Sequence, residues 1–152
     1  MLRDTIPGSS QRFKQDPVTG ILLFYDQSRS TYISTDRETY RFGIGHVNIN
    51  RPRWMILTGG GNTLTNGNLV PRNGVITCLS VSTKNTTTDC VFKIRSLIAG
   101  PDITSISLLG TSSNVIDNLA ININQNDRIR VFADVISGKL DYPELSVEIA
   151  WR

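Results

Sequence analysis

The stretch that decides the fold is LAININQNDRIRVFADVISGKLDYPELSVEIAWR, residues 119–152. Apolar and polar side chains alternate along it in three segments, which are separated by the turn-forming residues 125–127 and 137–139. A strict period of two over segments of this length is typical of strands with one buried and one solvated face. We therefore predict three consecutive strands, with Ile121, Val131 and Ile149 on the face that packs in the core.

The rest of the chain also indicates strands and no helix. Short apolar or β-branched runs are separated by Gly, Pro and Asn turns, whereas residues 110–117 lack such a run and are expected to form a loop. The expected strands are 21–25, 32–34, 39–43, 54–58, 75–83, 90–95 and 103–109. The fold class is therefore all-β, a sandwich of about 8–10 antiparallel strands. A jelly roll fits better than an immunoglobulin-like sandwich, whose Cys…Trp…Cys spacing is absent.

Residues 1–17 form a separate unit in this interpretation. They are polar, contain Pro7-Gly8-Ser9-Ser10 and show no periodicity, so we expect an extended N-terminal attachment arm, followed by the jelly-roll domain at 18–152. Apolar and basic side chains of the arm are the candidates for contact with a partner. These are Leu2, Arg3, Ile6, Pro7, Arg12 and Phe13.

Composition excludes several classes. The net charge is +3 and the pI about 9.1, but the basic residues are scattered and no recognition element accompanies them, so nucleic-acid binding is not expected. No signal-peptide core is visible, and no run approaches the ~18 apolar residues that a membrane span requires. A soluble, cytoplasmically made protein is predicted. Cys78 and Cys90 fall on strands expected to be neighbours, where a bridge fits the geometry, but reduced thiols are expected without secretion.

No constellation of residues indicates catalysis. His46 is the only histidine and has no metal-binding neighbours, and the Gly-rich run 59–61 is not followed by the Lys-Ser/Thr and helix of a phosphate-binding loop. Asp26, Asp36 and Glu38 alternate with arginines, so they are expected to form ion pairs instead of a catalytic pair of acids. We predict no enzyme activity, no cofactor and no metal.

Two surfaces are candidates for binding. Val91, Phe132 and Ala150 occupy the polar phase of their strands, and a subunit interface would bury them, which favours a homo-oligomer. The loop 59–68 offers an alternative: Trp54, Asn62 and Asn66 would form a ligand surface there.

Four segments resemble parts of small tailed-bacteriophage virion proteins, of the capsid-decoration or head-fibre type with a tumour-necrosis-factor-like jelly roll. The segments are DQSRSTYIS at 26–34, DRETYRFG at 36–43, VPRNGVIT at 70–77, and LDYP at 140–143 followed by VEIAWR at 147–152. Together these segments span most of residues 20–152, and none of them covers the first 17 residues.

This resemblance implies a virion structural protein, made in the cytoplasm of a host bacterium, that decorates or stabilises the capsid. The family typically forms homotrimers with the chain ends near one base. The arm would then dock on the major capsid protein or another virion protein. The alternative is a receptor-binding or carbohydrate-binding module of a phage tail or head appendage, with a glycan as its partner.

Overall fold

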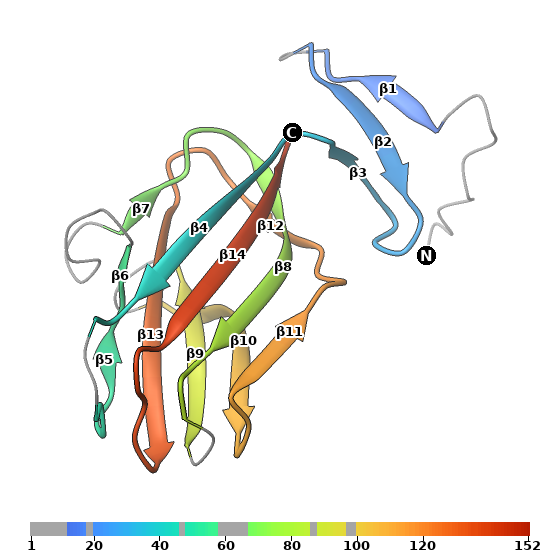
Figure 1. Cartoon of the computed structure of the whole chain (residues 1–152). Coiled ribbons are helices and arrows are strands. Elements are labelled where there is room, and N and C mark those ends of the chain that lie inside the picture. Colours follow the sequence, from blue (N-terminus) through green and yellow to red (C-terminus); the bar gives the residue numbers. More distant parts are fainter. Residues whose placement is uncertain (1–11, 18–19, 46–47, 58–66, 86–87, 97–99) are drawn as a thin grey trace.

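The computed structural model describes residues 12–17, 20–45, 48–57, 67–85, 88–96 and 100–152. All of the secondary structure in these ranges is β-strand, which confirms the predicted all-β class (Figure 1). The strands are β1 (Phe13–Gln15), β2 (Leu22–Asp26), β3 (Thr31–Ser34), β4 (Arg37–Gly43), β5 (Arg53–Trp54), β6 (Ile56–Leu57), β7 (Asn68–Leu69), β8 (Gly74–Ser82), β9 (Asp89–Arg95), β10 (Asp102–Leu109), β11 (Ser113–Ile116), β12 (Ile121–Ile123), β13 (Arg128–Ser137) and β14 (Glu144–Trp151).

Two antiparallel sheets form the sandwich. One has the order β11-β8-β14-β4-β6, with β12 also paired to β8, and the other has the order β10-β9-β13-β5, with β7 also paired to β13. The eight strands of a jelly roll are obtained when β11 and β12 are counted as one interrupted strand and the short β6 and β7 are left out. Numbered in chain order from β4 to β14, these strands are arranged 6-3-8-1 in the first sheet and 5-4-7-2 in the second. This order is that of two interleaved Greek keys, the arrangement of a jelly roll.

The stretch 119–152 supplies strands to both sheets. β12 and β14 lie on either side of β8, whereas β13, which comes between them in the chain, belongs to the opposite sheet. Val131 of β13 and Ile149 of β14 are completely buried in the core between the sheets, as predicted. Ile121 packs against this core but is only half-buried.

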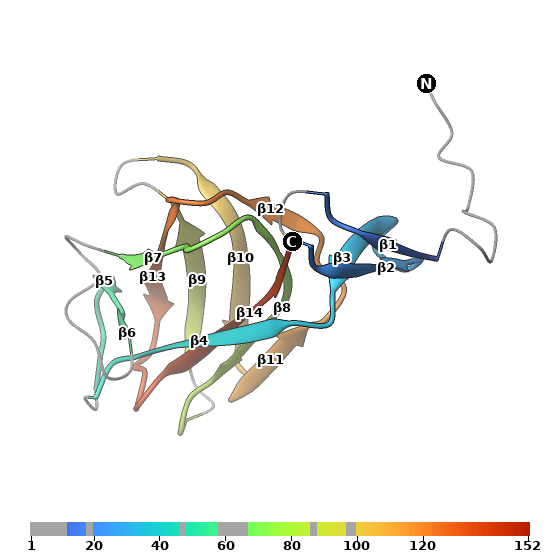
Figure 2. The same cartoon turned by 90° about the horizontal axis from the view of Figure 1, so that it is seen from above.

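A third, smaller sheet of β1, β2 and β3 lies at one end of the sandwich (Figure 2). Ile33 of β3 packs with Val75 and Ala150 of the six-stranded sheet, and all three are completely buried, with Phe24 beside them. β1 pairs with β2, and the amide of Tyr25 donates to the carbonyl of Arg12 at 2.8 Å. The small sheet therefore contains residues from both sides of the predicted boundary at 17/18.

Two details of the strand predictions were wrong. Residues 113–116, expected in a loop, form β11 and pair with β8; the strand is mostly exposed and has only two apolar residues, Val115 and Ile116, so it lacks an apolar run. The expected strand 54–58 is divided at Met55, which is completely buried. β5, before Met55, pairs with β13, and β6, after it, pairs with β4, so the chain crosses between the sheets at this residue.

The cysteines are not on neighbouring strands, which corrects the prediction. Cys78 lies on β8 in the six-stranded sheet and Cys90 on β9 in the five-stranded sheet. Cys90 is buried in the core, Cys78 is half-buried, and both thiols are free. Burial is the largest cause that raises the pKa of Cys90, to about 12, with the charge of Asp134 adding to it.

Candidate functional site

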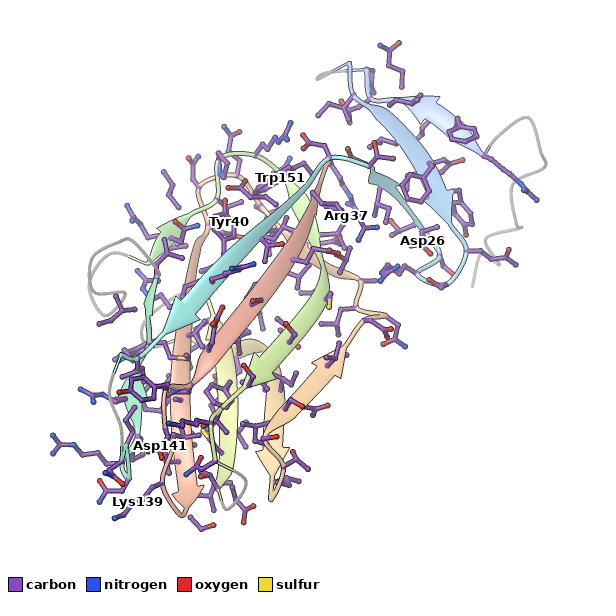
Figure 3. All side chains as sticks on the ribbon, in the orientation of Figure 1. Asp26, Arg37, Tyr40, Lys139, Asp141 and Trp151 are labelled. Atoms are coloured by element: carbon purple, nitrogen blue, oxygen red, sulfur yellow. The ribbon has the colours of Figure 1, made fainter. Side chains whose placement is uncertain are left out.

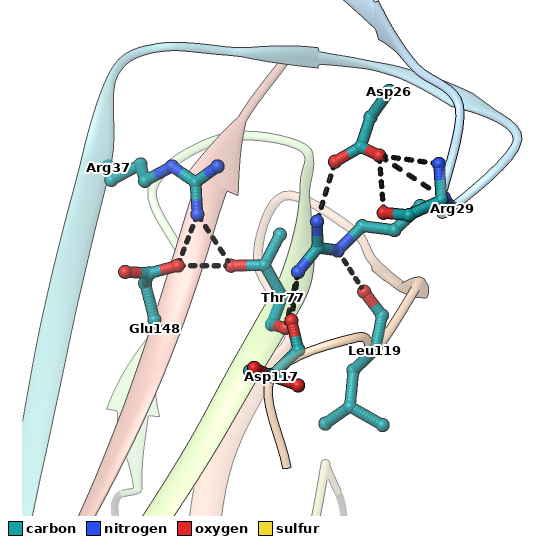
Figure 4. A network of polar contacts seen from close by, with 8 residues as sticks. Asp26, Arg29, Arg37, Thr77, Asp117, Leu119 and Glu148 are labelled. Carbon is teal, nitrogen blue, oxygen red and sulfur yellow. Dashed lines mark hydrogen bonds and ion pairs between the residues drawn. The ribbon is translucent and has the colours of Figure 1, made fainter. Parts of the chain in front are cut away.

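The residues that connect the small sheet to the sandwich form a polar cluster, which we call the junction. Asp26 and Arg29 come from the β2–β3 hairpin, Arg37 from β4, Thr77 from β8 and Glu148 from β14 (Figure 4). In Figure 3, Arg37 and Trp151 lie at this end of the sandwich, and Lys139 and Asp141 at the opposite end. The junction is therefore distant from the β13–β14 turn.

The hairpin places Arg29 through local hydrogen bonds. Asp26 Oδ1 accepts from the amide of Ser28 at 2.9 Å, from its hydroxyl at 2.6 Å and from the amide of Arg29 at 3.2 Å. An Asp side chain that binds the backbone two residues later is a turn-forming device, and Ser30 completes the turn with a φ of +51°. The sequence DQSRS at 26–30 thus directs Arg29 toward the sandwich.

The Arg29 guanidinium joins three segments of the chain. It donates to Asp26 Oδ2 at 2.5 Å, to the carbonyl of Leu119 at 2.8 Å and to that of Thr77 at 3.2 Å, and also to the carbonyl of Asp117. The side chain is only 11% exposed. A nearly buried guanidinium whose donors meet one carboxylate and three carbonyls holds these three segments of the chain together.

The side chain of Thr77 reaches the junction because Thr77 lies in a β-bulge of β8. Cys78 pairs with Glu148 and Ile76 pairs with Ile149, so Thr77 is an extra residue on β8. Its hydroxyl donates to Glu148 Oε1 at 2.6 Å, and Arg37 forms an ion pair with the same oxygen. Bulges characteristically redirect a side chain in this way.

The junction lowers the pKa of both of its carboxylates. Partial burial raises the pKa of Glu148, but the hydrogen bonds from Thr77 and Arg37 and the charges of Arg37 and Arg29 outweigh burial, so the pKa lies below the ordinary 4.5. Burial likewise raises the pKa of Asp26, and the hydrogen bonds from Ser28 and Arg29 outweigh it, so the pKa lies below 3.8. Both groups therefore stabilise the fold as anions.

A pH dependence of stability follows. Because the pKa of Glu148 is lower in the folded protein than in the unfolded chain, its contribution is complete above about 4.5 and is lost as the pH falls through the folded value. Glu148→Gln is expected to lower the free energy of unfolding at pH 7 by about 0.5 kcal/mol, since the group is partly exposed. Urea titrations from pH 7 to pH 3 should show the two proteins converging at the acid end. A difference that persists unchanged at pH 3 would contradict this assignment.

Three of the predicted surface residues lie on the outer face of the five-stranded sheet. Trp54 and Phe132 are in register on β5 and β13, with ring centroids 5.1 Å apart in an edge-to-face arrangement. The Arg95 guanidinium lies 5.8 Å from the first ring and 5.4 Å from the second. Val91 of β9 is half-buried on the same face. The predicted ligand residue Trp54 and interface residue Phe132 thus share one half-exposed surface.

Ala150 is not on that surface. It is completely buried under Ile33 of the small sheet, so packing within the chain explains its apolar side chain in the polar phase of β14. The prediction missed this because it expected another subunit, and not an earlier segment of the same chain, to cover Ala150.

The other candidate residues are placed only in part. Phe13 is 63% exposed on β1, and Arg12 is also exposed. Leu2, Arg3, Ile6, Pro7, Asn62 and Asn66 lie outside the described residues, as does His46. In the part of the chain that the structure describes, no group of three or more His, Cys, Asp or Glu side chains could hold a metal ion. No helix in the same ranges is long and apolar enough to cross a membrane.

The sequence predicted that these acidic residues form ion pairs, but not which partners they have. Arginines that alternate with Asp26, Asp36 and Glu38 indicated salt bridges, and Asp26–Arg29 is such a pair. Asp36 instead pairs with the distant Arg72. The sequence held no sign that Arg29 reaches Thr77, Asp117 and Leu119. The Asx-turn sequence DQS before it was the one local signal that could have suggested a specifically positioned side chain.

The fold and the junction define a jelly-roll sandwich with a docked accessory sheet. No family model matches the chain, and no curated protein matches it. Among solved structures, the chain is similar to one titled "Crystal Structure of FLHE", with 14% sequence identity, 78% of this chain and 99% of that chain covered, and a TM-score of 0.42.

Proposed function

We propose that this chain is a structural protein of a tailed-bacteriophage particle, which attaches through its N-terminal arm and carries a jelly-roll sandwich on the particle surface. The main support for the proposal is that the phage-like segments meet at the junction. Segment 26–34 supplies Asp26 and Arg29, segment 36–43 supplies Arg37, segment 70–77 supplies Thr77, and segment 147–152 supplies Glu148. Short segments scattered along the chain thus build one junction, between the sheet that receives the arm and the sandwich.

The arrangement suits an attachment role. The arm enters the small sheet as β1, and the small sheet is joined to the sandwich by the apolar cluster around Ile33 and by the Arg29 hydrogen bonds. A pull on the arm would therefore be transmitted through a strand ladder and a buried arginine. The opposite end, with Lys139 and Asp141, would face away from the attachment point (Figure 3).

Association of the sandwiches completes the proposal. The half-exposed surface of Trp54, Phe132 and Val91 is the candidate subunit interface, with a homotrimer as the expected assembly. Aromatic residues and arginine are the side chains that interface centres favour. Three arms on one trimer would bind a particle far more tightly than one arm alone.

Deletion of residues 1–11 tests this function. The deletion leaves Arg12 and the whole small sheet in place, so the truncated protein should fold and keep the oligomeric state of the full chain in solution. The binding partner is a phage particle purified from a strain in which the gene for this protein has been deleted. In co-sedimentation, these particles should bind the full chain and should bind the truncated chain at least tenfold less. Truncated protein that sediments with particles as well as the full chain would show that the arm is not the attachment element.

The second candidate function is recognition of a receptor or carbohydrate by the sandwich. It is favoured by Trp54, whose half-exposed ring stands beside Phe132 and Arg95 on an open sheet face. Exposed aromatic rings bordered by charged groups can stack on sugar rings. Adsorption of the purified protein to host cells, compared between the full chain and Trp54→Ala, separates this function from the particle role.

A further inference from the structure

A polar groove with a volume of about 380 Å³ lies between the small sheet and the turns at the adjoining end of the sandwich. Four carboxamide side chains line it: Asn73 from the turn before β8, and Asn122, Asn124 and Gln125 from β12 and the turn that follows. The volume falls within the range of small-molecule sites. This groove is separate from the Arg29 contacts and from the Trp54–Phe132 surface.

The two turns that carry the carboxamides are tied to each other. The amide of Gln125 donates to Asn73 Oδ1 at 2.8 Å, and the amide of Asn126 donates to the carbonyl of Val70 at 2.9 Å. The amide of Val70 in turn donates to the carbonyl of Asp127 at 2.8 Å. The lining is therefore held in place before any ligand arrives, which reduces the entropic cost of binding.

The carboxamides themselves are available. The side-chain amide groups of Asn122, Asn124 and Gln125 are exposed and make no hydrogen bond with other described residues. Each carboxamide offers two N–H donors and one carbonyl acceptor. A sugar hydroxyl both donates and accepts, so a row of such groups matches a polyhydroxylated ligand.

The charges in the groove are balanced. Arg72 forms an ion pair with Asp36 and lies 5.2 Å from the ring centroid of Trp151, and Asp16 lines the groove together with Arg152. The Arg152 side chain donates to Thr31 Oγ1 at 3.0 Å, but its Nε atom is buried and has no acceptor among the described residues. Cations and carboxylates of similar number give little preference for a charged ligand.

We propose that this groove is a binding site for a neutral saccharide, held by the carboxamides of Asn73, Asn122, Asn124 and Gln125. Arg72 covers the Trp151 ring, so hydrogen bonding instead of ring stacking provides the affinity. A single site of this kind is expected to be weak, with a dissociation constant on the order of 1 mM. Several copies on one particle would raise the overall affinity for a glycan-covered surface.

The test is nuclear magnetic resonance of the isotope-labelled full chain. Glucose, galactose, mannose and N-acetylglucosamine are added separately, with glucuronate and inorganic phosphate as charged comparisons. At least one neutral sugar should shift the backbone amides of residues 72–74 and 122–125. The double variant Asn122→Ala, Gln125→Ala should bind that sugar at least tenfold more weakly, while Gln27→Ala, an exposed carboxamide in the β2–β3 turn, should bind it unchanged.

Three results would overturn the proposal: no shift with any neutral sugar, a stronger response in the groove to glucuronate or phosphate, and shifts confined to the Trp54–Phe132 surface. The measurement uses the isolated protein and does not depend on a phage particle. Failure of saccharide binding and failure of particle attachment are therefore separate outcomes.

Discussion

Ala150→Asp is expected to release the small sheet from the sandwich. Ala150 is completely buried against Ile33 and Val75. Arg37 is opposite Ala150 on β4 but already forms an ion pair with Glu148, so a carboxylate at position 150 would be buried without a cation of its own. Such a charge costs about 3 kcal/mol or more, which the protein avoids by separating the two parts. Amide exchange in residues 22–34 should then be roughly a hundredfold faster, because each 1.4 kcal/mol is a factor of ten.

The matched control is Ser146→Asp on the same strand. Ser146 is half-buried on the outer face of β14 and pairs with Arg41, so a carboxylate is tolerated there. Exchange in β9 and β13 should stay slow in both variants. If Ala150→Asp left residues 22–34 protected but dissociated an oligomer, Ala150 would belong to a subunit interface, as its position in the sequence first indicated.

The fate of Ala150 shows what the sequence could and could not predict. Alternation along 128–137 and 144–151 was sufficient to identify β13 and β14 and to place Val131 and Ile149 in the core, because a period of two is a local property. The same alternation says only that a residue faces away from that core. What covers it depends on segments more than a hundred residues earlier in the chain, and the pattern carries no information on them.

The pairing of the strands could not be predicted from local alternation either. Cys78 and Cys90 lie on consecutive long strands, which are neighbours in a hairpin but belong to opposite sheets in a jelly roll. Their separation follows from the topology of the whole domain. The bulge at Thr77 is likewise visible only when β8 is aligned with β14, since one residue on β8 has no partner in the ladder. Local chemistry predicted the strands, and long-range pairing determined the site.

Arg29→Ala is expected to loosen the same sheet by a different route. The change removes the donors to the carbonyls of Thr77, Asp117 and Leu119 and leaves Asp26, whose side chain is only 12% exposed, without its cation. Loss of charge-assisted hydrogen bonds and a poorly solvated carboxylate should together cost about 3 kcal/mol. Residues 22–34 and 117–119 should exchange faster together, since Arg29 is the side chain that joins them.

Two further variants test whether the effect depends on the guanidinium of Arg29; they are Arg29→Lys and Arg41→Ala. An ammonium keeps the charge near Asp26 but lacks the planar set of five donors, so Arg29→Lys should recover only part of the lost protection. Arg41 is exposed on β4, and its removal should leave the exchange of both segments unchanged. If Arg29→Ala exchanged like the parent protein, the apolar cluster alone would hold the small sheet on the sandwich. If Arg29→Ala loosens the sheet while deletion of residues 1–11 does not, Arg29 and not the first eleven residues holds the small sheet on the sandwich.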